Sequence, residues 1–292
     1  MKILSGYIDN HCNFKLAVTK VIILKMIRKL QESDINGLNN LKPDDWNFDF
    51  EEFINKYFKD DFYYAFVIIH EKKIVGTGSV FLKAKIGWLG NIIIAKKYRG
   101  KGLGFEMTEF LVRFLKEQGC ETQLLIATKL GESVYNRVGF KKISEYICFD
   151  LKLEEHNPIS KSIRPLQKSD ILAVYNLDFK ANDEDRRHLL DKHYGTGFGY
   201  FNRDKELLGI YLPDFGNGLI LSENEIVGFE FLKIKHSQTN QRTLIPIENT
   251  AGISFLESLG NRVGVTASRM IMGKENKWNP KYIYSYGGGY CG

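Results

Sequence analysis

The sequence contains little proline and little cysteine, and it has no long apolar run. Six prolines are spread over 292 residues, and no stretch is of low complexity, which excludes a collagen-like or proline-rich disordered chain. The longest apolar run near the N-terminus is 21–24, between two lysines. It is much shorter than the ~20 residues of a membrane span and too short for the apolar core of a secretion signal. We therefore expect a soluble cytoplasmic protein with no membrane partner.

The few cysteines and histidines do not form a pattern. Cys12, Cys120, Cys148 and Cys291 are too far apart in the chain to indicate a disulfide framework or a redox pair. The six histidines are equally dispersed, so the spacing typical of a zinc site is missing. We expect no metal.

The charge of the chain is mildly basic, with 41 Lys and Arg against 35 Asp and Glu. The excess is spread over both parts of the chain. It is compatible with an anionic small molecule and argues against nucleic acid as a partner. The length is about twice the ~150 residues of a typical domain, which favours two domains.

A short repeat supports two domains. Residues 27–35 and 163–171 are identical at seven of nine positions, and each copy predicts a strand running into a helix capped by its serine. Residues 135–139 and 256–260 are similar helix ends. We therefore divide the chain into an N-terminal extension (1–21), a first domain (22–152), a linker (153–162) and a second domain (163–292). The two domains are expected to fold separately as the fragments 22–155 and 161–292.

Hydrophobic periodicity predicts a mixed α/β pattern in the first domain. The predicted strands are 22–30, 63–70, 74–82, 86–95, 123–127 and 141–151. The predicted helices are 33–41, 50–58, 102–117 and 131–138.

One segment of this domain carries the signature of an anion site. Residues 92–104 run from an apolar strand through a basic glycine loop into a helix, and Lys96, Lys97, Arg99 and Lys101 surround the glycines. Glycine lets the backbone come close to a ligand, and a helix N-terminus presents unpaired N–H groups with a partial positive charge. This combination suits a pyrophosphate. The dinucleotide-binding pattern fails because its third glycine position is Phe105, and a Walker loop fails because no Gly-Lys-Ser/Thr follows.

Arg99, Gly102 and Gly104 fit the pattern R-x-x-G-x-G, which resembles the coenzyme A loop of the GNAT superfamily of N-acetyltransferases. The order of predicted elements is also similar to that of the family, as is Tyr135 in a helix four residues before Gly139-Phe140. The resemblance covers residues 22–152. It implies an α/β (α+β) GNAT fold in two tandem copies, each with a mixed, mostly antiparallel sheet flanked by helices.

The resemblance also implies a site for acetyl-CoA as acyl donor. The backbone of Arg99, Gly100, Lys101, Gly102, Leu103 and Gly104 would hold the pyrophosphate. Backbone groups of Ile92 and Ile94 would pair with the pantetheine arm. Tyr135 would lie near the sulfur as general acid, since a tyrosine is protonated at pH 7.

Two features of the first domain differ from the family or leave a role unfilled. Thr128 stands where the family commonly has Asn, seven residues before the tyrosine. The strand 86–95 has no Asp, Glu or His, so we name no general base. His70 and Glu71 are interpreted as solvated residues at a hairpin end.

The second domain lacks the cofactor features. Its strand-to-helix junction at 219–225 has no glycine loop, and Glu223 and Glu225 would repel a pyrophosphate. Ser222 and Glu225 predict a capping box. Leu256 stands at the tyrosine position, although Asn249 stands seven residues before it. This arrangement resembles tandem GNAT proteins with an active N-terminal and a degenerate C-terminal domain, the latter helping to shape the acceptor pocket.

The function predicted from these motifs is transfer of an acetyl group to a primary amine of a small molecule or peptide, by direct attack. The alternative is a non-catalytic acyl-CoA sensor. The resemblance is also compatible with a homodimer. We interpret the tail 284–292 as a packed aromatic end rather than a lining of the acceptor site. Residues 185–188 are interpreted as a solvated helix face rather than an anion site.

Overall fold

The structure, a computed structural model, describes residues 26–42, 49–153, 160–260 and 262–292. The predicted N-terminal extension, the start of the first predicted strand and most of the predicted linker lie outside these ranges. Among the helices of the described ranges, none combines the length and the apolar character that crossing a membrane requires.

The elements of the first half follow the predicted order. They are β1 (Met26–Lys29), α1 (Phe50–Tyr57), β2 (Tyr63–His70), β3 (Lys73–Lys83), β4 (Ile86–Ile94), α2 (Leu103–Glu117), β5 (Thr122–Thr128), α3 (Lys129–Val138) and β6 (Lys141–Phe149). The helix predicted over 33–41 is wrong. Two short 3₁₀ turns stand there, η1 (Glu32–Asp34) and η2 (Leu38–Leu41), because Gly37 between them has a left-handed φ of 95° that ends any continuous helix.

The second half contains a similar succession of elements. They are β7 (Ile163–Pro165), η4 (Lys168–Asp170), α4 (Ile171–Asn182), α5 (Arg187–Leu190), η5 (Tyr194–Thr196), β8 (Phe198–Phe201), β9 (Leu207–Leu212), β10 (Leu219–Ser222), α6 (Glu225–Gln238), β11 (Thr243–Pro246), α7 (Thr250–Leu259), β12 (Arg262–Gly273), η6 (Pro280–Tyr282) and β13 (Ile283–Ser285).

The nine-residue repeat folds in the same way twice. In the first copy Arg28 makes an ion pair with Asp34 at 2.6 Å, and in the second Arg164 pairs with Asp170 at 2.7 Å. Each pair ties a short strand to the turn that follows it. The two halves therefore begin with the same local structure.

The serine cap predicted for each repeat is wrong. The turns begin at Glu32 and Lys168, one residue before Ser33 and Ser169. The backbone N–H of the preceding glutamine instead donates to the carboxylate that ends the turn, at 2.7 Å in both copies. An ionised carboxylate is a stronger acceptor than a hydroxyl, and it takes the capping role.

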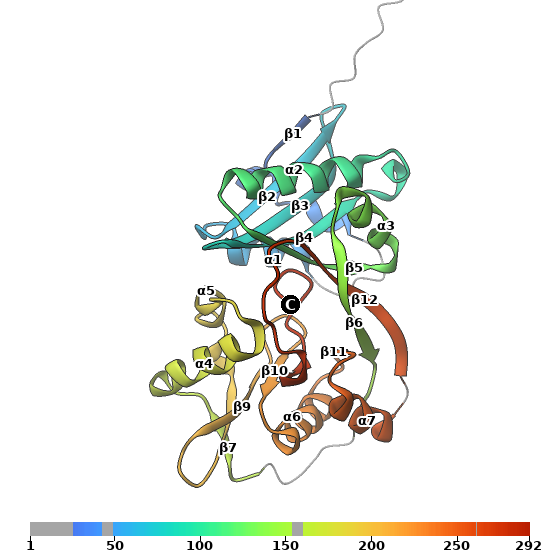
Figure 1. The fold of residues 1–292 in the computed structure, drawn as a ribbon. Coiled ribbons are helices and arrows are strands. Elements are labelled where there is room, and N and C mark those ends of the chain that lie inside the picture. The colour runs from blue at the N-terminus through green and yellow to red at the C-terminus, as the bar shows by residue number, and fades with distance from the viewer. Residues whose placement is uncertain (1–25, 43–48, 154–159, 261) are drawn as a thin grey trace, which may run out of the picture.

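The described strands form two sheets, and the second half adds two of its strands, β11 and β12, to the sheet of the first half (Figure 1). The larger sheet has the order β1-β2-β3-β4-β5-β12-β6-β11, and the smaller has the order β13-β10-β9-β8-β7. Among the strands of the described ranges, only the β4–β5 pair is parallel. Strand β12 of the second half lies between β5 and β6 of the first, and β6 also pairs with β11. The two predicted domains therefore share one sheet.

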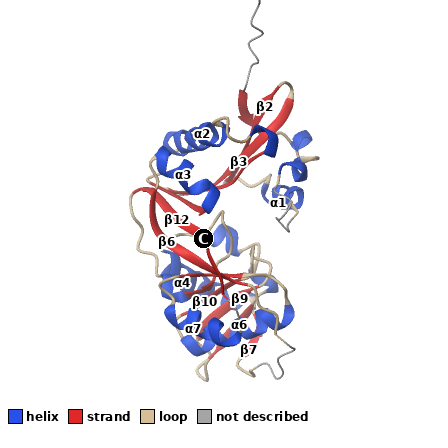
Figure 2. Ribbon diagram, turned by 90° about the vertical axis from the view of Figure 1, so that its right-hand side faces the viewer, coloured by secondary structure: helices blue, strands red, loops and turns tan. Residues whose placement is uncertain are grey.

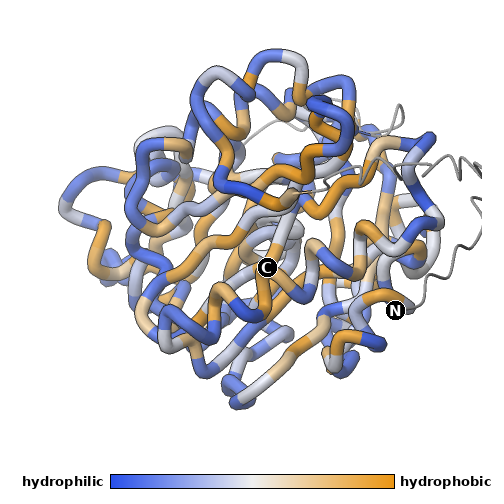
Figure 3. The backbone as a smooth tube through the Cα atoms, turned by 90° about the horizontal axis from the view of Figure 1, so that it is seen from above, coloured by the Kyte–Doolittle hydropathy of each residue, from blue (hydrophilic) through white to orange (hydrophobic). Residues whose placement is uncertain are grey.

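Helices cover both faces of the larger sheet. Figure 2 shows α2 and α3 on one side and α1 on the other. Helix α2 buries Met107, Leu111 and Leu115, which recur every four residues and pack on the sheet with Met270 of β12. In Figure 3 apolar residues gather in the interior of the tube, whereas many of its outer bends are hydrophilic.

The interpretation of 185–188 as a solvated helix face is wrong for Arg186 and His188. Arg186 is only 3% exposed, and its Nε donates to Asp178 of α4 at 3.0 Å. His188 packs edge-on against Phe62 of the first half at 4.5 Å between ring centroids. Burial of His188 lowers its pKa to about 4, so this ring is neutral at pH 7. The segment is part of the contact between the halves.

The shared sheet generates a first prediction. A fragment of residues 22–155 lacks β12, which leaves the facing edges of β5 and β6 unpaired and prone to aggregation. We expect it to lose the cooperative thermal transition of the full chain, as measured by circular dichroism. Producing fragments 22–155 and 161–292 together should restore the transition. A sharp transition in the first fragment alone would contradict this account and favour separately folding domains.

A buried lysine generates a second prediction. Lys235 of α6 is fully buried and donates to Ser285 of β13 at 2.8 Å. Burial lowers the pKa of Lys235 to about 7, against about 10.4 in an unfolded chain. Between these values the unfolded chain binds more protons, so the free energy of unfolding from this group rises with pH by up to about 1.4 kcal/mol per unit. Urea unfolding from pH 7 to 10 should show a smaller rise for Lys235→Met. Equal pH slopes would show that this lysine is charged when folded.

Candidate active site

The candidate site of the first half begins where the parallel strands β4 and β5 separate. Strand β4 pairs with β5 only from Ile86 to Leu89, whereas its pairing with β3 continues to Ile94. The register with β3 shifts next to Asn91, which has a φ of 53° and donates from its side chain to Ser79. We call the opening between β4 and β5 beyond Leu89 the split. In the part of the chain that the structure describes, residues 90–94 of β4 pair with no strand on that side.

Ile92 and Ile94 lie on this open edge. The N–H of Ala95 donates to Val75 of β3 at 2.9 Å, and backbone groups of alternate residues point to opposite sides of a strand. Ile92 and Ile94 therefore direct their backbone groups into the split. The carbonyl of Ile94 already accepts from Arg99 Nε at 2.9 Å, which leaves the Ile94 amide and the Ile92 groups as the open positions.

The basic loop joins this edge to α2. Gly100 and Gly102 have left-handed φ angles of 75° and 81°, and Gly102 is the N-cap of α2 but has no side chain to cap it. Within the described ranges, the amides of Leu103, Gly104 and Phe105 donate no hydrogen bond to a backbone carbonyl, and Glu106 is the acidic residue of the first turn. Unpaired N–H groups at the start of a 15-residue helix make an anion site.

Four basic residues lie in or next to the loop that leads to these amides. Lys96, Lys97, Arg99 and Lys101 are all exposed. The ammonium groups of Lys97 and Lys101 lie 5.0 and 5.3 Å from the ring centre of Tyr98 in the turn η3 (Lys96–Tyr98). One ring therefore organises two of the cations next to the helix N-terminus.

Tyr135 is a half-buried residue of α3. A Cβ added at Gly131 would lie 2.8 Å from Tyr135 Cε2, and the ring of Phe140 lies 6.3 Å from the tyrosine ring. Burial raises the pKa of Tyr135 to about 12, so its hydroxyl keeps its proton at neutral pH. Gly131 thus makes room for the ring, a role that only the folded structure reveals.

The residues flanking the site have clear positions. Thr128 ends β5 and is exposed. Glu71 lies in the β2–β3 turn, at the predicted hairpin end. His70 is not fully solvated, because its half-buried ring packs 5.4 Å from Tyr98. His70 therefore lies beside the cation cluster.

The corresponding junction of the second half is closed. Strand β10 pairs with β9 on one side and with β13 on the other, so the edge that is open in β4 is filled by the chain itself. Asn249 is the N-cap of α7, and its amide also donates to Ile283 of β13 at 2.9 Å. This buried asparagine fixes the filling strand.

The capping box predicted for Ser222 and Glu225 is wrong. Helix α6 starts at Glu225, and Asn224 is its N-cap, accepting from Val227 N at 3.2 Å. Ser222 is buried at the end of β10, where its hydroxyl bonds to the carbonyl of Leu208 at 2.9 Å. The strand therefore includes Ser222, and the helix begins at Glu225 rather than directly after Ser222.

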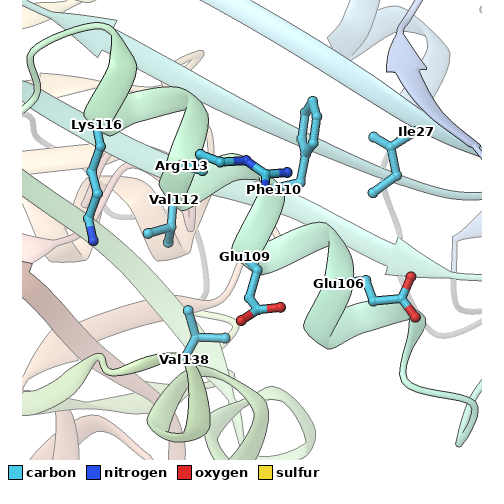
Figure 4. Close-up of a pocket in the computed structure, with 8 residues that line it drawn as sticks. All are labelled: Ile27, Glu106, Glu109, Phe110, Val112, Arg113, Lys116 and Val138. Carbon is cyan, nitrogen blue, oxygen red and sulfur yellow. The ribbon is translucent and has the colours of Figure 1, made fainter.

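A groove along α2 and a search for metal ligands add no further residue to this site. Figure 4 shows a groove along α2, lined by Ile27, Glu106, Glu109, Phe110, Val112, Arg113, Lys116 and Val138. It carries charges of both signs and includes none of the residues predicted to bind the donor. Among the described residues, no group of three or more His, Cys, Asp or Glu could hold a metal ion.

Comparison with known families identifies the first half. Its residues 26–140 match the model of the acetyltransferase (GNAT) family. This match supports a GNAT acetyltransferase domain over these residues. The predicted GNAT fold, with mixed sheets flanked by helices, is confirmed, and the second sheet with its helices is consistent with a second GNAT-like domain.

Similar proteins include several acetyltransferases. The chain is 31% identical over 84 residues to the uncharacterized N-acetyltransferase YobR of Bacillus subtilis, a match covering 28% of this chain and 34% of that protein. It is 27% identical over 139 residues to glucosamine 6-phosphate N-acetyltransferase of Arabidopsis thaliana. This match covers 40% of this chain and 91% of that protein. The chain thus spans about a third of the first relative. The crystal structure of a putative acetyltransferase from Pyrococcus horikoshii has the same fold, with 18% sequence identity and a TM-score of 0.69. The superposition covers 98% of this chain and 100% of that chain.

The uncapped loop generates a third prediction. Gly102→Val should weaken acetyl-CoA binding strongly, because a branched side chain would stand where the phosphate meets the backbone. The matched control is Gly119→Val at the end of α2, since Gly119 has a similar φ of 78° with nothing within 4 Å of its added Cβ. It imposes the same backbone strain away from the loop. Calorimetry should show lost binding for the first variant only. Equal affinities would remove the loop from the donor site.

Proposed function

We propose that this protein is an acetyl-CoA-dependent N-acetyltransferase that moves the acetyl group from the thioester to a primary amine by direct attack. The observation that carries the proposal is the combination of an open edge on β4 with the uncapped N-terminus of α2 at its end. A strand edge suits the amide-rich pantetheine arm, and the helix N-terminus suits the pyrophosphate. The GNAT match supports acetyl-CoA as the donor.

The donor would lie along this edge. Backbone groups of Arg99, Gly100, Lys101, Gly102, Leu103 and Gly104 would surround the pyrophosphate, and the exposed cations would neutralise it. The arm would pair with Ile92 and with the amide of Ile94, because the Ile94 carbonyl is taken by Arg99. The thioester would then reach the split between β4 and β5.

The chemistry is acyl transfer to nitrogen. The amine lone pair attacks the thioester carbon, the C–N bond forms, and the C–S bond breaks as the thiolate leaves. Tyr135 would donate its proton to the departing sulfur, since its raised pKa keeps the hydroxyl protonated. The amine loses its own proton to a group outside β4, because residues 86–95 include no Asp, Glu or His.

The second half would bind no CoA and would help to form the acceptor side. Its equivalent edge on β10 is filled by β13, and Glu223, next to the α6 N-terminus, is paired with Lys180 at 2.5 Å. For the acceptor we propose a small-molecule or peptide amine. The relative from Arabidopsis acts, by its name, on glucosamine 6-phosphate, which supports including amino sugars among the amines tested.

The proposal is tested by measuring thiol release from acetyl-CoA with a panel of amines, including amino sugars, polyamines, amino acids and peptides. At least one amine should release thiol in proportion to protein concentration. Binding of acetyl-CoA without turnover of any amine would favour a non-catalytic acyl-CoA sensor. Absence of binding would contradict both functions.

The role of Tyr135 generates a fourth prediction. Tyr135→Phe keeps the ring, so folding and acetyl-CoA affinity should hold while kcat falls by roughly 10²–10⁴-fold, the contribution typical of a general acid. Tyr64→Phe, which removes a hydroxyl from a ring packed on Phe114, is the matched control. In the wild type the acid form persists below the pKa of about 12, so Tyr135 should cause no loss of rate between pH 7 and 10. A change in kcat below about threefold would assign the proton to another donor.

A further inference from the structure

The glycine-rich end of the chain forms a compact loop that is not a loose tail. The amides of Cys291 and Gly292 both donate to the carbonyl of Gly288, at 3.2 and 2.9 Å, and the amide of Gly287 donates to Gly292 at 3.1 Å. Cys291 is fully buried. We call residues 286–292 the tail loop. Its own hydrogen bonds fix its shape.

The tail loop crosses the split. Gly289 faces β5, because a Cβ added there would lie 3.9 Å from Ile126. Tyr290 faces β4, where a Cβ added at Gly90 would lie 2.9 Å from Tyr290 Cβ. Gly90 is the first β4 residue beyond the paired region. The loop therefore bridges the two strands at the point where they separate.

The loop lies on the side of the sheet opposite α2. The Tyr290 ring packs against Phe53 of α1 and Phe81 of β3, with centroids 4.8 and 5.0 Å apart. Helix α1 and helix α2 cover opposite faces (Figure 2). In Figure 1 the C-terminal end lies between the two sheets, next to β4. The predicted pyrophosphate site at the start of α2 and the tail loop thus belong to different faces of the same split.

The second half holds the loop in place. Arg186 Nη1 donates to the carbonyl of Cys291 at 2.6 Å, and the same guanidinium is paired with Asp178 in the buried interior. The N–H of Asn217 donates to the carbonyl of Gly287 at 2.7 Å. Strand β13 leads directly into the loop. The position of Tyr290 is therefore set by groups of the second half, although its ring packs on the first.

We infer that the tail loop is the acceptor-side wall of the acyl-transfer site, that Tyr290 contacts the acyl group or the incoming amine, and that Arg186 is a positioning residue for it. This inference rests on the proposed function, which brings the thioester to the split along β4. Because the donor would occupy the edge that continues into α2, the amine would approach from the opposite face, beside the loop. The wall also excludes water, which would otherwise hydrolyse the thioester.

Affinity labelling tests the position of the loop. In Tyr290→Cys, bromoacetyl-CoA bound along β4 would bring its reactive carbon beside the new thiol. The thiolate would displace bromide and form a thioether, which mass spectrometry locates. Tyr282→Cys, in the turn η6, is the matched control. We expect labelling of residue 290 that excess CoA prevents, and none at 282.

The outcomes separate this inference from the proposed function. If bromoacetyl-CoA competes with acetyl-CoA in calorimetry but leaves residue 290 unlabelled, the wall is elsewhere and the inference is overturned. If wild-type protein binds neither compound, the proposed function itself fails, and the inference fails with it.

A second measurement uses the wild-type loop sequence. Gly90→Ala pushes a methyl group toward Tyr290 from β4, and Arg186→Met removes the bond to Cys291 from the second half. Measured at saturating acetyl-CoA, both should raise thiol release in the absence of amine several-fold, and Arg186→Lys should restore part of the protection. A purely structural Arg186 would lower the melting temperature in both Arg186 variants without changing hydrolysis. Unchanged hydrolysis in all three variants would contradict the inference.

Discussion

The insertion of β12 between β5 and β6 is the interaction on which the rest of the structure depends. Strand β5 pairs with β12 over Thr122–Thr128, its whole length, but with β4 over only four residues. The second part of β5 therefore stays paired with β12 where it has left β4, and the split lies between β4 and that part of β5. A strand from the second half thus forms one border of the opening that a donor would use in the first.

Strand β12 also joins two cores, because its successive side chains point to opposite faces. Met270 enters the core under α2, whereas Arg269 is fully buried. The guanidinium carbon of Arg269 lies 4.8 Å from the ring centre of Trp88 and 4.1 Å from that of Trp278. Arg269 lies 3.6 Å from Glu184, which also accepts from Trp88 Nε1 at 2.7 Å. Burial raises the pKa of Glu184, and the neighbouring guanidiniums oppose that effect. Charges this deeply buried are tolerated only as pairs, so they favour one way of joining the halves.

The two halves use one scaffold in different ways. Both begin with the same Arg–Asp ion pair, and in both a strand leads into a long helix. In the first half the strand edge is open and the helix is capped only by glycine. In the second half β13 fills the edge and Asn224 caps the helix. The segment that fills the second edge continues into the tail loop over the first, so the feature that closes one half also covers the other.

The sequence alone determined the features that depend on neighbours in the chain. Alternation and helical spacing placed most elements of the first half to within a few residues, and the pattern at Arg99, Gly102 and Gly104 located the uncapped helix start, because left-handed glycines and missing caps are local properties. The tertiary structure decided which strand pairs with which edge, that Arg186 is buried rather than solvated, that Ser222 ends a strand rather than capping a helix, and that Tyr290 lies over Gly90. Those features depend on contacts between residues up to about two hundred positions apart, such as Gly90 with Tyr290. Such pairings are selected by burial and hydrogen bonding in the whole fold, and no local pattern encodes them.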